Sequence, residues 1–489
     1  MENNNKALIT ILLLGFLFRL AFILSPNELL ITIVPDDAFY YFQTGKHILQ
    51  SGFSSFDGIN YTNGYHPLWM LLILPFQLIS NPWLSLRLIL LLANIFSLIS
   101  GWLFYKISKK IFNNSSTAMF SLILFFLNPI VIAQDLNGLE TSLSSLIFMI
   151  CLYFVLQTFK NKYSLFNYGV ILGLLFLSRT DNIFYILGFL AILTWQYKFA
   201  SVYSFLSFGL VSSIWIILNM EHGFVQSSGM AVPLVLKDEF LSQGKNQFLL
   251  FRRSVKLFID FFLFRMYQFI GINRMVFWFL GILSLFKIMS KKIYLNKQWQ
   301  KIFILILFSL GLIVAHVSYR WYPRHWYFCQ FIALICLVFG WSFKRVKKGN
   351  YRIFTLVFVV IFNLTLAIKF LINGVYPAQL EILRSTEWIR ENIQEERVGV
   401  FNSGIISYFS GRTIVNLDGA INTNAYHALK KKDLTGYIKE QELDYIIDYQ
   451  PVMGEMYRLY LTGLDYQLVE IIDISEIDWH NSKIEVWRL

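Results

Sequence analysis

The stretch PDDAFYYF at residues 35–42 comes shortly after the first long apolar run of the chain, at residues 7–25. It places two adjacent carboxylates, Asp36 and Asp37, beside a segment long enough to cross a lipid bilayer. Removing charge from water at a membrane boundary is costly unless a partner or a substrate compensates it. The acid pair therefore sets the question of fold and the question of function together.

The composition indicates a membrane protein. Of 489 residues, 56% are apolar, 18% are aromatic and only 15% are charged, against roughly 25% charged residues in an average soluble domain. With a mean hydropathy of +0.54, most of the apolar surface is expected to face lipid. These values exclude a disordered chain and a simple soluble enzyme. Cys151, Cys329 and Cys336 all lie inside apolar runs, which predicts neither a disulfide framework nor a metal site.

The net charge of +12 is the sum of two unlike parts. Residues 1–375 hold 12 acidic and 31 basic side chains, whereas residues 376–489 hold 18 acidic and 11 basic ones. The boundary falls near Gly374 and Pro377. This division argues against a nucleic-acid partner, because the basic residues belong to the membrane part. We predict a transmembrane catalytic domain at 1–375 and a soluble domain at 376–489.

Apolar segments predict about eleven transmembrane helices. They lie at residues 7–25, 85–105, 117–134, 141–159, 164–178, 183–199, 201–219, 275–290, 302–318, 326–343 and 353–372. Lysine and arginine clusters mark alternate ends, as a cytoplasmic N-terminus requires. The agreement holds only if the short run at 66–79, with its prolines, lies at the interface without crossing. Eleven crossings put the tail outside, together with long outer loops at 26–84 and 220–274.

The acid pair has two interpretations. Adjacent carboxylates repel each other, so one is expected to be a general base or a ligand while its neighbour stays ionised. Alternatively, the pair caps the helix that begins at Ala38, where acidic side chains are favoured. That helix, at 38–49, is amphipathic and is expected to lie in the headgroup layer. The turn-rich stretch at 60–69 contains His66, which is more often structural than functional.

The first outer loop resembles that of a known superfamily. Asp36-Asp37-Ala-Phe-Tyr-Tyr followed by Asn63-Gly-Tyr-His-Pro-Leu-Trp69 is similar to the first extracytoplasmic loop of GT-C glycosyltransferases, polytopic enzymes that take a sugar from a polyprenyl-phosphate carrier. The closest resemblance is to the bacterial group described as dolichyl-phosphate-mannose-type or RgtA/B/C/D-like transferases. It implies a GT-C-like fold over nearly the whole chain, with an extracytoplasmic C-terminal domain. It also implies substrate binding by Tyr40, Asn63 and His66.

Two further outer sites carry acids at span ends. Asp135 and Glu140 flank a turn that resembles the second outer loop of the superfamily, whose acid faces the first; the alternative is a glycine turn before a helix. Arg179 and Asp181 offer a cation and an anion together, and in the superfamily such a pair lies near the active cleft. A local salt bridge that caps the next helix is the alternative interpretation.

Two other outer loops are candidates for lipid contact. The loop at 319–327 contains Arg320, Tyr322, Arg324 and His325, a composition suited to a lipid phosphate and an isoprenoid tail, or to an aromatic belt at the headgroups. The loop at 220–274 is long and basic. It is either a mobile lid or carrier-lipid platform, or an ordinary helix on an anionic membrane surface.

The tail predicts a small α/β domain. A helical pattern at 377–393 precedes short apolar runs at 398–401, 413–417, 445–447, 466–474 and 483–487. Asn402 and Asp418 follow two of these strands, a position that often lines ligand sites, although turn structure is the better explanation of these residues. The absence of a glycine-rich phosphate motif from the sequence argues against a nucleotide-sugar enzyme.

These observations predict an inverting transferase in a bacterial cytoplasmic membrane. Asp36 or Asp37 accepts the proton of an acceptor hydroxyl on a lipid, glycan or protein, and the donor is a polyprenyl-phosphate sugar. Arginine stabilises the leaving phosphate, the candidates being Arg179, Arg320 and Arg324. A divalent cation, Mg²⁺ or Mn²⁺, is the alternative source of positive charge, with Asp36, Asp37, Asp135 or Glu140 as its ligands. The competing hypotheses are a transporter or flippase of polyprenyl lipids or polysaccharides and a non-catalytic partner in an envelope-polymer complex.

Overall fold

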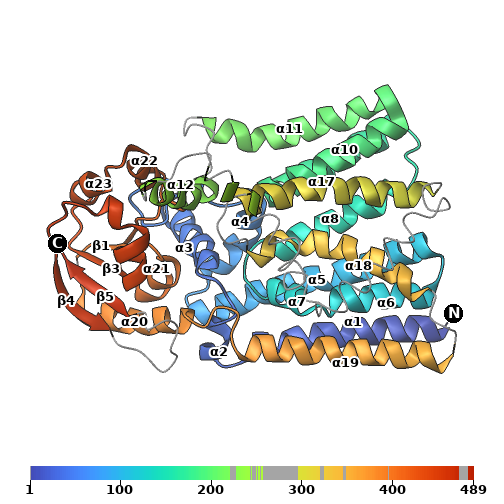
Figure 1. Cartoon of the computed structure of the whole chain (residues 1–489), viewed down its shortest axis with the longest axis horizontal. Coiled ribbons are helices and arrows are strands. Elements are labelled where there is room, and N and C mark those ends of the chain that lie inside the picture. Colours follow the sequence, from blue (N-terminus) through green and yellow to red (C-terminus); the bar gives the residue numbers. More distant parts are fainter. Residues whose placement is uncertain are drawn as a thin grey trace.

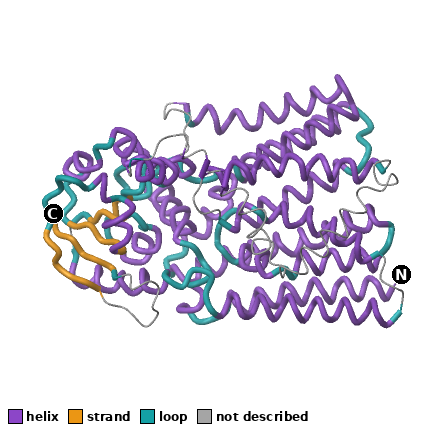
Figure 2. The backbone as a smooth tube through the Cα atoms, viewed as in Figure 1, coloured by secondary structure: helices purple, strands orange, loops and turns teal. Residues whose placement is uncertain are grey.

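The computed structural model describes residues 2–220, 227–242, 296–319, 324–344, 349–394, 396–472 and 483–489, with isolated positions between 244 and 256. Long helices run side by side over most of its length, and the C-terminal segment with its strands lies at one end (Figures 1 and 2). The N-terminus lies near the opposite end of the bundle (Figure 1). The expected span at 275–290 and most of the loop at 220–274 lie outside the described residues.

The helices of the bundle coincide with the apolar runs. They are α1 (Glu2–Ile23), α5 (Pro82–Phe112), α6 (Ser115–Phe126), α7 (Pro129–Asp135), α8 (Thr141–Val155), α9 (Lys162–Ser178), α10 (Ile183–Tyr197), α11 (Val202–Leu218), α17 (Lys297–Tyr319), α18 (Cys329–Phe343) and α19 (Asn350–Ile372). Five helical stretches of the described chain are long and apolar enough to cross a membrane, and the pair α6 and α7, bent by 57°, makes a sixth. The chain is an integral membrane protein, and eleven crossings stay a prediction.

Shorter elements cover the end of the bundle that faces the C-terminal segment. They are α2 (Asn27–Ile31), α3 (Asp36–Ser51), α4 (Pro67–Ile73), the 3-10 turn Leu74–Leu78 and α12 (Ser227–Ser242). Helix α3 begins at Asp36, not at Ala38, and Pro35 is its N-cap residue. The acid pair therefore occupies the first turn of α3, where negative charge suits the helix dipole, and does not precede the helix as a cap.

The C-terminal segment contains one mixed sheet. Its strands are β1 (Val398–Val400), β2 (Ile414–Asn416), β3 (Tyr445–Tyr449), β4 (Gln467–Ile472) and β5 (Ile484–Arg488), in the order β2-β1-β3-β5-β4. The first three strands are parallel, and β5 pairs antiparallel with both β3 and β4. The accompanying helices are α20 (Gln379–Asn392), α21 (Gly404–Ser410), α22 (Thr423–Lys431) and α23 (Leu434–Glu440). Each strand falls on one of the short apolar runs of the tail.

The apolar core continues across the expected boundary at residue 375. One cluster of buried side chains includes residues of the bundle and residues of α20, β1 and α21. Phe39 on α3 is fully buried and lies 5.5 Å, centroid to centroid, from the rings of both Tyr408 and Phe409 on α21. This face of α3 packs on the C-terminal segment, contrary to the expectation that it lies in the lipid headgroups. The two parts of the chain therefore build one continuous structure.

Candidate active site

The two acids of the first loop occupy different environments. The carboxylate of Asp36 is buried and accepts the N–H of Gly404 (2.8 Å) and the N–H of Ile405 (2.7 Å), at the start of α21. Burial raises the pKa of Asp36 to about 7, and these two hydrogen bonds oppose the rise. Asp37, the next residue, is exposed and lines a cavity. One acid therefore ties α3 to the C-terminal segment, and the other faces the space where a ligand would bind.

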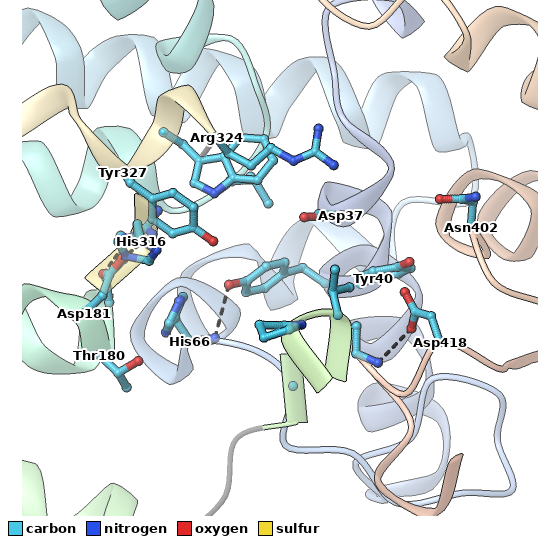
Figure 3. Close-up of a pocket in the computed structure, with 18 of the residues that line it drawn as sticks. Asp37, Tyr40, His66, Thr180, Asp181, His316, Arg324, Tyr327, Asn402 and Asp418 are labelled. Carbon is cyan, nitrogen blue, oxygen red and sulfur yellow. Dashed lines mark hydrogen bonds and ion pairs between the residues drawn. The ribbon is translucent and has the colours of Figure 1, made fainter. Parts of the chain in front are cut away.

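The cavity has a volume of about 680 Å³ and lies where the bundle meets the C-terminal segment. Its wall combines α3, the first loop near His66, the ends of the bundle helices, α12, and the ends of β1 and β2 (Figure 3). The volume is that of a typical small-molecule site. Apolar side chains of α12, Val232, Pro233 and Leu236, form part of the lining. An apolar wall beside several charges suits a ligand that has both a lipid and a polar part.

A chain of ion pairs crosses one side of the cavity. Arg179 contacts Glu140 at 3.0 Å and Asp181 at 2.7 Å, and the Nε2 atom of His316 lies 3.2 Å from Asp181 (Figure 3 shows His316 and Asp181). The hydroxyl of Tyr41 donates to Glu140 at 2.8 Å. Each member of this chain is held from at least two sides, which fixes its position before any ligand binds.

Aromatic rings lie against the positive groups of the cavity. The ring of Tyr327 stacks on His316 at 3.7 Å, and the guanidinium of Arg179 lies 4.8 Å from the centre of the Tyr327 ring. Arg324 is exposed, lies 5.8 Å from the ring of Trp326 and lines the cavity. Whereas two carboxylates contact Arg179, Arg324 is the more accessible of the two guanidinium groups.

The C-terminal segment contributes its own polar groups. Asn402 follows β1 and Asp418 follows β2, and both line the cavity (Figure 3). Removal from water raises the pKa of Asp418 to about 7, and the negative charges of Asp37 and Asp36 add to the rise. Burial raises the pKa of Tyr40, and the negative charges of Asp418, Asp36 and Asp37 add to the rise. The Tyr40 hydroxyl lies 3.5 Å from the carbonyl oxygen of Phe401. The acids of α3 and the acid after β2 therefore act on one another across the cavity.

Comparison with known proteins shows which solved structures have a similar fold. A family model described as dolichyl-phosphate-mannose-protein mannosyltransferase matches residues 67–219, and a domain of unknown function (DUF8728) matches residues 372–487. The crystal structure of ArnT from Cupriavidus metallidurans bound to undecaprenyl phosphate aligns with a TM-score of 0.53 at 10% identity, over 99% of this chain and 97% of that one. The chain therefore has the fold of the ArnT structure, and about a third of it matches the mannosyltransferase family model.

A second ArnT structure gives the same result. In the apo state, ArnT from the same organism aligns with this chain at a TM-score of 0.53 and 9% identity, over 98% of both chains. A search of curated protein sequences returns no significant match. At this identity the likeness concerns the fold, so the roles of the cavity residues must be argued from this chain alone.

The cavity gathers most of the residues that the sequence singled out. Those that line it are Asp37, Tyr40, His66, Glu140, Arg179, Asp181 and Arg324. Asp36 lies behind the wall, bonded to α21. Arg320 and Tyr322 lie outside the described residues.

Three other candidates lie away from the described cavity wall. Asn63 donates to the side chain of Asn219 at 2.7 Å. Asp135 is bonded to Arg19 of α1 at 2.7 Å. His325 packs edge-on against the Phe370 ring, and burial together with the adjacent Arg324 lowers the pKa of His325 to about 4.

The cavity also contains residues that the sequence pattern did not indicate. His316 lies inside an expected span, where a histidine among apolar residues is no distinct signal. The apolar residues of α12 come from a loop whose sequence is chiefly basic and amphipathic. The position of Asn402 and Asp418 after two predicted strands did indicate a ligand site, because side chains that follow neighbouring parallel strands meet at one edge of the sheet.

The described residues do not fit a bound divalent cation. Among them, no three histidine, cysteine, aspartate or glutamate side chains are grouped to hold one. Of the ligands proposed from the sequence, Asp36 is engaged by backbone N–H groups, Asp135 by Arg19, and Glu140 by Arg179 and Tyr41. The permanent positive charge along the described part of the cavity wall is that of the Arg179 and Arg324 guanidinium groups.

Proposed function

We propose that the chain is an inverting glycosyltransferase that moves a sugar from a polyprenyl-phosphate donor to an acceptor hydroxyl, with Asp37 as the base. One observation carries the proposal. In a GT-C fold, Asp37 and Arg324 line the same cavity, which lies at the end of the membrane helices. A base and a cation in one site are what glycosyl transfer from a lipid phosphate requires, because a proton must leave the acceptor and charge develops on the leaving phosphate.

The different environments of the two acids assign their roles. Asp36 has both carboxylate oxygens bonded to backbone N–H groups, so its task is to position the first turn of α3. Asp37 is held in place by that turn and lines the cavity. A carboxylate that receives a proton must reach the acceptor hydroxyl within hydrogen-bond distance, and Asp37 meets this condition better than Asp36.

Arg324 is the preferred group for the donor phosphate. Arg179 already balances two carboxylates, which suits an arginine that holds the wall together. Arg324 is exposed to the cavity, and guanidinium groups bind phosphate oxygens in a bidentate manner. Arg324 lines the same cavity as Asp37, and both side chains are exposed. Phosphate binding by Arg320 stays a prediction, because Arg320 lies outside the described residues.

The proposed reaction is one displacement at the anomeric carbon. The acceptor O–H transfers its proton to the Asp37 carboxylate while its oxygen forms a bond to the anomeric carbon. The bond between that carbon and the phosphate oxygen breaks, and the polyprenyl phosphate leaves with the electron pair, stabilised by Arg324. Attack from the face opposite the leaving group inverts the configuration. The Asp37 proton then passes to solvent.

The donor class and the membrane face follow from the surroundings of the cavity. The described part of α12 gives the wall an apolar portion, next to bundle helices that meet lipid, which suits an isoprenoid chain. The ArnT structure similar to this chain was solved with undecaprenyl phosphate. The distribution of lysine and arginine supports a cytoplasmic N-terminus and an extracytoplasmic cavity in a bacterial cytoplasmic membrane.

The proposal is tested by comparing lipids from cells with and without the gene. Mass spectrometry of lipid-linked sugars is expected to show a polyprenyl-phosphate sugar that accumulates when the gene is deleted and returns to its normal level with the wild-type gene. Asp37→Asn is expected to behave like the deletion, since loss of a general base costs about 10²–10⁴-fold in rate.

The matched control is Glu28→Gln, which also neutralises an exposed carboxylate of the first outer loop. It is expected to restore normal lipid levels. If the deletion leaves all lipid-linked sugars unchanged, or if Asp37→Asn complements as well as the control does while both proteins reach the membrane in equal amounts, the proposed function is refuted.

A further inference from the structure

The cavity has two halves of different composition. The arginine and histidine side chains of its described lining, Arg179, Arg324, His66 and His316, come from the bundle and its loops, which also supply the carboxylates of Asp37, Glu140 and Asp181. The C-terminal segment contributes only uncharged and acidic side chains to the described lining: Phe401, Asn402, Asp418, Ala420, Val452, Met456 and Tyr457. Arg324, the exposed guanidinium of the bundle half, can bind a phosphate, whereas the described lining contributed by the C-terminal segment contains no cation that could do so.

Asp418 is held rigidly at the end of β2. Its Oδ1 atom accepts the N–H of Ala420 at 2.7 Å (Figure 3). Gly419 has a φ of +75°, and a Cβ atom there would lie 2.8 Å from the Cα atom of Tyr426. Only glycine therefore fits at this position of the turn. A carboxylate fixed in this way needs no reordering when it binds a ligand.

The turns after β1 and β2 are also tied to each other. The side chain of Asn416 donates to Ser403 at 2.9 Å and accepts the N–H of Gly419 at 3.1 Å. Asn402 is in turn fixed by its hydrogen bond to Asp448 at 2.9 Å. The carboxylate of Asp418 and the amide of Asn402 therefore form one preorganised polar edge of the sheet.

Aromatic rings lie next to this polar edge. Tyr457 lines the cavity and stacks on Phe401 at 4.0 Å between centroids, and Tyr40 of α3 lies within the electrostatic influence of both Asp418 and Asp37. Carboxylate and amide groups beside aromatic rings match the hydroxyls and the apolar faces of a sugar ring. The composition of this half fits a carbohydrate and not a phosphate group.

We infer that the ends of β1 and β2 form the acceptor subsite, in which Asp418 accepts a hydrogen bond from a hydroxyl of an uncharged carbohydrate whose neighbouring hydroxyl is deprotonated by Asp37. The inference rests on the proposed function and adds the class of acceptor to it. It gives the C-terminal segment a direct part in catalysis: the bundle binds the donor, and the sheet binds the acceptor.

The test measures which substrate the C-terminal segment binds. The donor is the lipid-linked sugar purified from cells that lack the gene, and the acceptor is the envelope fraction of the same cells. Asp418→Asn is expected to raise the apparent KM for the envelope fraction by about 10- to 100-fold, the loss expected for a hydrogen bond to a charged group. The KM for the donor is expected to stay unchanged.

Asp465→Asn is the matched control, because Asp465 is an exposed aspartate of the same segment that does not line the cavity. Asp418→Glu, which keeps the carboxylate, is expected to recover part of the acceptor affinity. If Asp418→Asn does not reach the membrane, Asp418→Ser is measured in its place. An Asp418 variant that matches the control, or that raises only the KM for the donor, overturns the inference.

The nature of the product provides an independent check. A sugar attached to a carbohydrate hydroxyl survives mild acid, whereas a sugar attached to a phosphate is released. Release of the transferred sugar by mild acid overturns the uncharged acceptor while leaving the glycosyltransferase intact. If the wild-type protein transfers nothing from the purified donor, the proposed function fails instead, so the two failures are distinguishable.

Discussion

The buried ion pair between Arg19 and Asp135 offers a test of whether Asp135 is structural or binds substrate. Arg19 is completely buried in α1 and donates to Asp135 from Nε at 3.0 Å and from Nη2 at 2.7 Å. Asp135 also accepts the hydroxyls of Ser97 at 2.6 Å and Ser142 at 3.0 Å. Asp135 therefore joins four helices, α1, α5, α7 and α8, through its side-chain contacts.

Asp135→Asn is expected to lower the free energy of unfolding by about 3–5 kcal/mol, because it leaves the charge of Arg19 buried without a counter-ion. Arg19→Met is expected to cost a similar amount by leaving Asp135 unpaired. The double variant Arg19→Met/Asp135→Asn removes both charges, and the amide oxygen of the asparagine can still accept a hydrogen bond from Ser97 or Ser142. It is therefore expected to be more stable than either single variant.

The assay is unfolding of the detergent-solubilised protein by sodium dodecyl sulfate, followed by tryptophan fluorescence, as a double-mutant cycle. Glu28→Gln is the control, because it removes an exposed carboxylate from the membrane part. An Asp135→Asn variant with the stability of the wild type and a raised KM for donor or acceptor would refute the structural role and restore the sequence-based assignment of Asp135 to substrate binding.

Three further predictions concern the cavity and the contacts behind it. Arg324→Gln is expected to raise the KM for the lipid-linked donor by about tenfold or more while leaving the KM for the acceptor unchanged, since it removes a charge-assisted hydrogen bond to phosphate; the reverse pattern would contradict the assignment. Gly404→Ala is expected to lower the melting temperature because its Cβ atom would lie 2.3 Å from the carbonyl oxygen of Asp36, whereas Gly454→Ala, with no atom within 4 Å, is expected to be neutral. Asp418 has a pKa raised to about 7 from 3.8, so its contribution to stability falls as pH rises from about 4 to about 7 and is constant above that range. Melting temperatures measured from pH 4 to 8 are expected to fall less steeply with pH for Asp418→Asn than for the wild type. Identical pH profiles of the two proteins would be inconsistent with the raised pKa of Asp418.

The sequence was sufficient for features that depend on local pattern. Short apolar runs located the five strands of the described tail to within a few residues, because a buried strand shows its pattern in a few positions. The pairing of Arg179 with Asp181 followed from their separation of two residues at a helix end. The acid pair was found because two charges next to an apolar run are conspicuous.

Features that depend on distant residues could not be predicted in this way. The different roles of Asp36 and Asp37 depend on N–H groups 368 and 369 positions later in the chain, which no local pattern reveals. The partner of Asp135 lies 116 positions earlier, in an apolar helix. The apolar side chains of α3 repeat with the spacing expected of a helix that lies in the lipid headgroups. The packing of Phe39 on Tyr408 and Phe409 shows that this face contacts protein, which the sequence pattern cannot reveal.

The bond between Asp36 and α21 explains why neither part of the chain makes a complete site. Asp37 follows Asp36 in the same helical turn, so the N–H groups of Gly404 and Ile405 that fix Asp36 also fix the direction in which Asp37 points. The segment that carries Asp418 is thus the segment that positions the proposed base. Helix α3 is also tied to the bundle, because the hydroxyl of Tyr41 donates to Glu140 at 2.8 Å. The proposed base is therefore fixed from both sides of the cavity, which would keep it aligned between the donor phosphate and the acceptor hydroxyl.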